Sequence, residues 1–219
     1  METMLNIDIV SDIVCPWCFI GKRRLAVAVA SVRRQVPDFA YQARWRPFFL
    51  NPDTPPEGEP YLPFLERKFG SRAAVEALFG RVRDAGRPYG IDYAFEKIKL
   101  RANTLRAHRL IYWAQQKGDV EALVERLFAA QFLHGEYVGD IALLAGIAAE
   151  FGHDATEVAR YLASTEDEEL VRQREREVRA MGISMVPTFI LPGNKVIVGA
   201  EDPEILAAGM LECLAKKGT

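Results

Sequence analysis

The chain has 219 residues, of which 49% are hydrophobic and 26% are charged. These proportions are typical of a folded globular protein with one domain, or with one domain that carries a large insertion, and they exclude a disordered or fibrous chain. The formal net charge of −2 gives no general reason to expect binding to nucleic acid or to anionic membranes.

The N-terminal segment predicts a protein of the cytoplasm. It contains Glu2, Asp8 and Asp12 and lacks a positive region followed by a long apolar run, so it does not resemble a signal peptide. No stretch of about 18 uninterrupted apolar residues occurs in the sequence, and no transmembrane helix is therefore expected.

The first part of the chain predicts a strand, a helix and a second strand. Residues 5–10 are rich in β-branched side chains, as in a short strand. Residues 18–34 are helical in character, and Pro37 ends that helix. Residues 40–48 alternate with a period of two, which indicates a strand with one buried face. Together they form a β-α-β unit.

The middle of the chain predicts a linker followed by helices. Residues 51–60 are rich in proline and are read as a linker. Five or six helices are expected from there to about Gly182. One of them is predicted to begin with a capping box formed by Thr165 and Glu168.

The C-terminal part predicts a hairpin and a final helix. Residues 186–191 and 195–198 are strand-like, and the Pro-Gly-Asn turn between them is short enough for an antiparallel hairpin. A helix at about residues 203–216 follows.

This order of elements predicts an α/β fold. It is a thioredoxin fold with a large all-helical domain inserted between its β-α-β and β-β-α halves. The expected thioredoxin-like domain comprises residues 1–52 and 182–219, and the expected helical insertion comprises residues 53–181.

The two cysteines after the first strand are the best candidates for chemistry. Cys15 and Cys18 flank Pro16 and Trp17 at the start of the expected helix. Unpaired backbone N–H groups and the helix dipole favour a thiolate at this position, and the thiolate is the nucleophile in disulfide exchange. Cys15 is therefore the expected attacking thiol. Cys18, one turn further on, is the expected resolving thiol.

Other interpretations of the cysteine pair are weaker. A zinc site normally needs four ligands, and no second pair of Cys or His residues has suitable spacing; no metal is expected. A structural disulfide is disfavoured in the cytoplasm, and a pair of inert core cysteines does not explain a position between strand and helix. The third cysteine, Cys213, is read as a buried core residue, because free cysteine packs well in cores.

Three segments together resemble a known family. Residues 11–21, which contain the Cys-Pro-Trp-Cys sequence, are similar to the active-site signature of DsbA-like thiol oxidoreductases, and more narrowly of the FrnE-type branch, which is cytoplasmic. Residues 103–110 resemble a helix start in the inserted domain of that family, and residues 186–189 resemble its cis-proline loop. The resemblance spans nearly the whole chain.

The resemblance implies roles for individual residues. Cys15 would be the nucleophile, Cys18 the resolving thiol, and Pro187 a cis-proline facing the pair, with the backbone of Val186 binding an extended substrate. Pro16 and Trp17 would also border the substrate. Because tryptophan cannot become cationic, we expect a weaker oxidant than the periplasmic enzymes that carry Pro-His between their cysteines.

Substrate and partners are less well defined by the sequence. The expected substrates are proteins or small thiols, with no bound cofactor and with glutathione as a candidate redox partner. His108 is a candidate for substrate or glutathione binding if the helices fold over Cys15, and otherwise for packing at an interdomain seam. Two alternative functions remain: a glutathione-dependent isomerase or transferase similar to 2-hydroxychromene-2-carboxylate isomerase or the kappa-class transferases, and a chaperone without turnover. A homodimer is compatible with the family.

Overall fold

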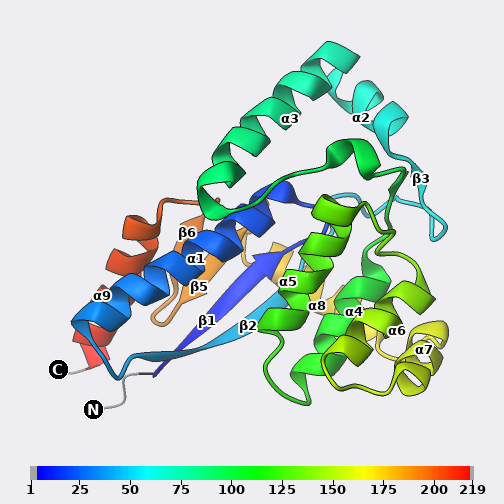
Figure 1. Cartoon of the computed structure of the whole chain (residues 1–219). Helices are drawn as coiled ribbons and strands as arrows, with labels where there is room; N and C mark the ends of the chain where they lie inside the picture. The colour runs from blue at the N-terminus through cyan, green and yellow to red at the C-terminus, as the bar shows by residue number, and fades with distance from the viewer. Residues whose placement is uncertain (1–3, 218–219) are drawn as a thin grey trace.

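The structure, a computed structural model, describes residues 4–217 and contains a four-stranded sheet in the order β2-β1-β5-β6 (Figure 1). Strands β1 (Met4–Ser11) and β2 (Ala40–Pro47) are parallel over their whole length. Strands β5 (Thr188–Leu191) and β6 (Lys195–Val198) form the predicted antiparallel hairpin, and β5 lies antiparallel to β1. Strand β1 is thus central, and its C-terminal end carries the cysteine loop.

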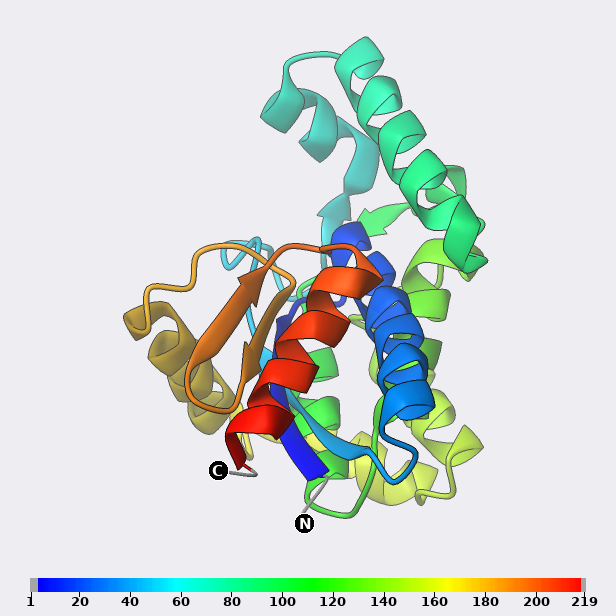
Figure 2. The ribbon, with the colours of Figure 1, turned by 90° about the vertical axis from the view of Figure 1, so that its left-hand side faces the viewer.

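One face of the sheet is covered by two helices that lie side by side (Figure 2). Helix α1 (Pro16–Gln35) connects β1 to β2, and helix α9 (Pro203–Lys217) ends the described chain. Apolar residues of β1 with odd numbers, such as Ile7 and Ile9, are fully buried in the core with Phe19 of α1. This packing fixes the start of α1 against the end of β1.

The opposite face of the sheet is covered by helices α4 (Leu105–Gln115) and α8 (Glu168–Ala180), which pack against β2. Beneath α8, a small apolar cluster joins the helix to three strands or their ends, through Val10, Phe48, Val178 and Ile190. Helix α8 is therefore part of the sheet's own covering layer.

The remaining elements lie beyond the end of the sheet and beside α4. Helices α2 and α3 project away from the rest of the molecule (Figures 1 and 2). Strands β3 and β4 pair antiparallel over two residues each. The bounds are β3 (Glu59–Pro60), α2 (Tyr61–Phe69), α3 (Arg72–Gly86), β4 (Leu100–Arg101), α5 (Glu121–Ala129), α6 (Ile141–Glu150) and α7 (Ala155–Ala163), with short turns of helix at Arg87–Tyr89, Phe95–Lys97 and Ala130–His134.

Three details differ from the expectations. The first helix begins at Pro16 rather than at residue 18, because proline is well placed in a first helical turn. The capping box at Thr165 was wrong: α8 begins at Glu168, and its N-cap is Asp167 in a left-handed conformation. The domain boundaries at residues 52 and 182 stay a prediction, although α8, inside the expected insertion, packs on the sheet.

Within residues 4–217, no helix is both long enough and apolar enough to cross a membrane.

Candidate active site

The two cysteines lie at the N-terminal end of α1. Cys15 is the N-cap residue in an extended conformation, and its N–H donates to the carbonyl of Asp12 at 3.0 Å. The N–H of Cys18 donates in turn to the Cys15 carbonyl at 3.0 Å. Both are free thiols, with Cys15 5% exposed and Cys18 1% exposed. The loop therefore places both thiols close together, with Cys15 on the side nearer to solvent.

The loop before β5 lies directly against this pair. The Cys15 Sγ donates to the Val186 carbonyl at 3.7 Å, and the Val186–Pro187 peptide bond is cis. The Pro187 carbonyl accepts a 2.7 Å hydrogen bond from Gly199, which ties the loop to the end of β6. Residues about 170 positions apart in the chain thus meet at one site.

A glycine of α1 makes this approach possible. A Cβ added at Gly21 would lie 2.7 Å from Pro187 Cγ and 3.3 Å from Phe189 Cζ. The ring of Pro187 therefore sits on the backbone of α1, one turn after Cys18. Gly21 belongs to the segment that resembles the family signature, but its role could not be read from the sequence.

The Cys18 thiol is held in its protonated form. Burial raises its pKa well above the usual 9.0, and the hydrogen bond to Cys15 and the charge of Cys15 raise it further. The Ser11 hydroxyl and the backbone N–H of Asp12 act in the opposite direction, because they stabilise negative charge on the Cys18 sulfur. Cys18 is thus a thiol that must lose its proton before it can attack.

Tyr93 connects the helical region to the cysteine loop. Its hydroxyl donates to the Pro16 carbonyl at 2.6 Å, and its ring packs against Phe95 and Phe132. Burial, together with the nearby Cys15 and Cys18, raises the pKa of Tyr93 strongly, so it stays neutral. Sequence reasoning missed Tyr93, because nothing in its local pattern points to a residue 77 positions earlier. Trp17 remains 37% exposed beside the site.

His108 reaches the cysteine loop indirectly. Its Nε2 lies 3.2 Å from Asp12 Oδ1, and the other carboxylate oxygen accepts the N–H of Leu50 at 2.9 Å. Asp12 is 0% exposed and His108 is 5% exposed. The rings of His108 and Phe49 pack edge to face. His108 therefore lies at the seam between α4 and the sheet, where it anchors the residue whose carbonyl accepts the Cys15 N–H; its role in substrate binding stays a prediction.

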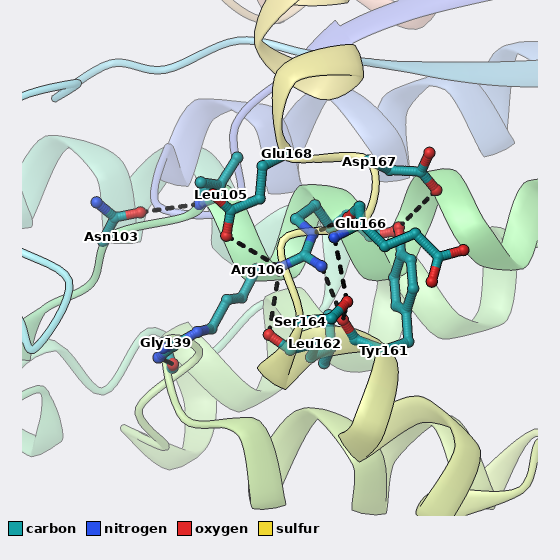
Figure 3. Close-up of polar contacts among 11 residues, drawn as sticks. Asn103, Leu105, Arg106, Gly139, Tyr161, Leu162, Ser164, Glu166, Asp167 and Glu168 are labelled. Atoms are coloured by element: carbon teal, nitrogen blue, oxygen red, sulfur yellow. Dashed lines mark hydrogen bonds and ion pairs between the residues drawn. The ribbon is translucent and has the colours of Figure 1, made fainter.

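A buried arginine holds α4 in place behind this seam. Arg109, 0% exposed, donates to the carbonyls of Tyr161, Leu162 and Glu166 and pairs with Glu168. Figure 3 labels these four partner residues. Arg109 thereby fixes the end of α7 and the start of α8 to α4. Sequence reasoning assigned no role to this residue, although an arginine within an apolar helix is a signal that could have drawn attention.

A cavity of about 870 Å³ opens between β2, α4 and α8, with Trp45, Arg46, Tyr112 and Gln115 among its lining residues. It reaches the active-site side through Ser11, Ile13 and His108 but is not lined by either active-site cysteine.

In the described part of the chain, no group of three or more His, Cys, Asp or Glu residues could hold a metal ion. Cys213 is buried, as predicted, and its thiol donates to the Pro192 carbonyl.

Strand order, cysteine placement and the proline loop define a thioredoxin-fold protein with a redox-type active-site geometry. The chain belongs to the family of DSBA-like thioredoxin domains, whose model matches residues 6–210. The predicted fold class, with its helical insertion, is thereby confirmed, and so is the predicted DsbA-like family.

Relatives cover nearly the whole chain. The crystal structure of a probable DsbA oxidoreductase, SCO1869 from Streptomyces coelicolor, superposes with a TM-score of 0.87 at 28% identity, covering 96% of this chain and 90% of that one. The uncharacterized protein YwbO from Bacillus subtilis is 24% identical over 97% of this chain and 99% of its own. The cytosolic disulfide reductase DsbM from Pseudomonas aeruginosa shares the fold, with a TM-score of 0.65 at 16% identity over 96% and 99% of the two chains, and has also been solved with glutathione (GSH).

Proposed function

We propose that this protein is a thiol–disulfide oxidoreductase that works through Cys15 and Cys18 on protein or small-thiol substrates. The observation that carries the proposal is the placement of the Cys15 sulfur at a helix N-terminus, 3.7 Å from the Val186 carbonyl and beside Pro187. A disulfide bound along the Val186 backbone would present one sulfur to Cys15, and Cys18 lies behind, within reach of the mixed disulfide.

The proposed reaction has two steps. In the first, the Cys15 thiolate attacks a substrate disulfide, forms a Cys15–substrate disulfide and expels one substrate sulfur as a thiolate. In the second, Cys18 loses its proton and attacks the Cys15 sulfur. The Cys15–Cys18 disulfide forms, the second substrate sulfur leaves with its electron pair, and the substrate has gained two electrons. The reverse sequence oxidises a dithiol.

Whether the enzyme reduces or oxidises its substrates depends on the residues between the cysteines and on the redox state of the compartment. Trp17 cannot supply a cationic donor to Cys15, which favours a weaker oxidant than one with histidine at this position. A cytoplasmic location, with glutathione as electron donor and without a bound cofactor or metal, would run the enzyme as a reductase or isomerase. DsbM, described as a cytosolic disulfide reductase and solved with GSH, supports this choice of partner by similarity of fold alone.

The test is the redox equilibrium of the protein in glutathione buffers, with Cys15→Ser and Cys18→Ser as controls. A single two-electron transition that is lost in both variants supports the proposal. If no intramolecular disulfide forms across the range, or if Cys15→Ser retains glutathione-dependent isomerisation, the oxidoreductase function is refuted. Client protection that survives loss of both cysteines would indicate a chaperone instead.

A further inference from the structure

The hydroxyl of Ser11 is buried without a hydrogen-bond partner. Ser11 is the last residue of β1 and is 3% exposed, and its Oγ pairs with no polar atom of the described residues. Two other buried side-chain atoms in residues 4–217 share this condition, the Nε atoms of Arg24 and Arg101, but both guanidinium groups are anchored through other nitrogens. Ser11 is different, because the hydroxyl is its only side-chain polar group. Such groups are rare in native proteins and often have a chemical role.

The direction of the Ser11 side chain follows from the strand. Ile7 and Ile9, which share its parity along β1, are buried in the core with α1, whereas Val10 lies in the cluster beneath α8. The Ser11 side chain therefore points toward α1. The Ser11 backbone carbonyl is already used, since it accepts the N–H of Phe48 at 3.1 Å. Only the hydroxyl is left without a partner.

The group that the hydroxyl faces is the resolving cysteine. Two backbone hydrogen bonds, from Cys15 to Asp12 and from Cys18 to Cys15, turn the short loop between β1 and α1 back on itself, so Cys18 follows Ser11 after a single tight turn. The Ser11 hydroxyl and the Asp12 N–H are the two groups that favour negative charge on the Cys18 sulfur. A thiol accepts hydrogen bonds weakly, whereas a thiolate accepts them strongly. An unpaired donor beside a protonated thiol is thus a donor without its acceptor.

We propose that the Ser11 hydroxyl is the hydrogen-bond donor that stabilises the Cys18 thiolate during the resolving step. This inference rests on the proposed oxidoreductase function. When Cys18 loses its proton to solvent, Ser11 donates to the new thiolate alongside the Asp12 N–H. Cys18 then attacks the Cys15 sulfur, the bond from Cys15 to the substrate sulfur breaks, and the leaving sulfur carries away the electron pair and takes up a proton from solvent.

The role is specific to one of the two chemical steps. Cys15 attacks the incoming disulfide while Cys18 is still a protonated thiol, so the Ser11 hydroxyl contributes nothing that this first step requires. In the second step Cys18 must ionise in a site where it is 1% exposed, so the thiolate depends on donors from the protein. Loss of the hydroxyl should therefore slow the second step and leave the first unchanged.

The experiment separates the two steps with dithiobis-nitrobenzoate, a symmetric aromatic disulfide that releases one coloured thiolate in each step. The full-length reduced protein is mixed with excess reagent in a stopped-flow instrument between pH 6 and 10. The variants are Ser11→Ala, which removes the donor, and Ser11→Thr, which keeps it. Cys18→Ser reports the first step alone, and Cys15→Ser reports any signal from Cys213.

The expected result is a slow second phase in Ser11→Ala only. Loss of one hydrogen bond to a thiolate should move the pH midpoint of that phase upward by about one unit and slow it about tenfold below the midpoint. The first phase should keep its rate, and Ser11→Thr should restore the second. Thermal unfolding of both variants checks that the fold is retained.

Two outcomes overturn the inference. If Ser11→Ala keeps the wild-type rate and pH midpoint of the second phase, the hydroxyl does not act on Cys18. If both phases slow by the same factor in Ser11→Ala and in Ser11→Thr, Ser11 has only a packing role. A wild-type protein that shows no second phase at all refutes the oxidoreductase function itself, and so the two failures are distinguishable.

Discussion

Replacing Gly21 with alanine tests whether the packing of Pro187 on α1 sets the geometry of the active site. The new Cβ would lie 2.7 Å from Pro187 Cγ, a distance at which one of the two must move, and the proline ring has no flexible end to yield. Alanine in the middle of a helix gains about 1 kcal/mol over glycine, whereas overpacking a core costs about 1–3 kcal/mol. The net effect on the free energy of unfolding should therefore lie between neutral and a loss of about 2 kcal/mol.

The matched control is Gly146→Ala in α6. Apart from its chain neighbours and the nearby backbone of its own helix, no described atom lies within 4 Å of the added Cβ. This variant should gain about 0.5–1 kcal/mol of stability from helix propensity alone. Chemical denaturation of the two variants should thus differ by about 1–3 kcal/mol. The same shift of Pro187 should disturb the 3.7 Å contact between Cys15 and Val186, so Gly21→Ala should also react more slowly with an aromatic disulfide. The reasoning is refuted if both variants are equally stabilised and Gly21→Ala reacts at the wild-type rate.

Three further predictions concern stability. Arg109→Met removes the charged hydrogen bonds to the Tyr161, Leu162 and Glu166 carbonyls and should lower the free energy of unfolding by about 3–5 kcal/mol. Arg106→Met, which loses one bond to the Gly139 carbonyl, should cost about 1 kcal/mol in the same denaturation assay; equal losses would contradict the role given to Arg109. Tyr93→Phe removes the bond to Pro16 and should cost about 0.5–1.5 kcal/mol without loss of fold, and an unchanged midpoint would argue against this tie. Burial raises the pKa of Cys18 well above 9.0, so its contribution to stability is present below pH 9 and is lost as the unfolded chain ionises above it. Wild-type stability should therefore fall above about pH 9 more steeply than that of Cys18→Ala; parallel curves would show that the thiol ionises equally in both states.

Local patterns were sufficient to predict the chemistry-bearing elements. Cys15 and Cys18 stand between a β-branched run and a helical run, and this position alone places them at a helix N-terminus. A hairpin at residues 186–198 was predicted from a short turn between two apolar runs, because hairpin geometry is determined by residues close in sequence; in the structure its first strand begins at Thr188. Both signals are local, and both are present in the structure.

The contacts that complete the site are not local. Tyr93, Gly21 and Arg109 act through residues that lie far from them in the chain, and their neighbours are fixed only by how helices pack on the sheet. The two-residue ladder of β3 and β4 is too short to show a period. The capping box at Thr165 failed because Asp167 adopts a left-handed conformation that begins the helix two residues later. Single-sequence patterns do not contain this information.

The placement of α8 bears on how this protein could be re-engineered or could have diversified. The helix belongs by chain order to the segment between the two halves of the sheet, yet its Val178 seals the cluster that contains Val10, Phe48 and Ile190. Excising residues 53–181 as a cassette, or exchanging them with those of a relative, would strip one face of the sheet and leave those side chains to water. Helix α4 covers the same face and contacts α8, so any exchange must leave both α4 and α8 with the sheet.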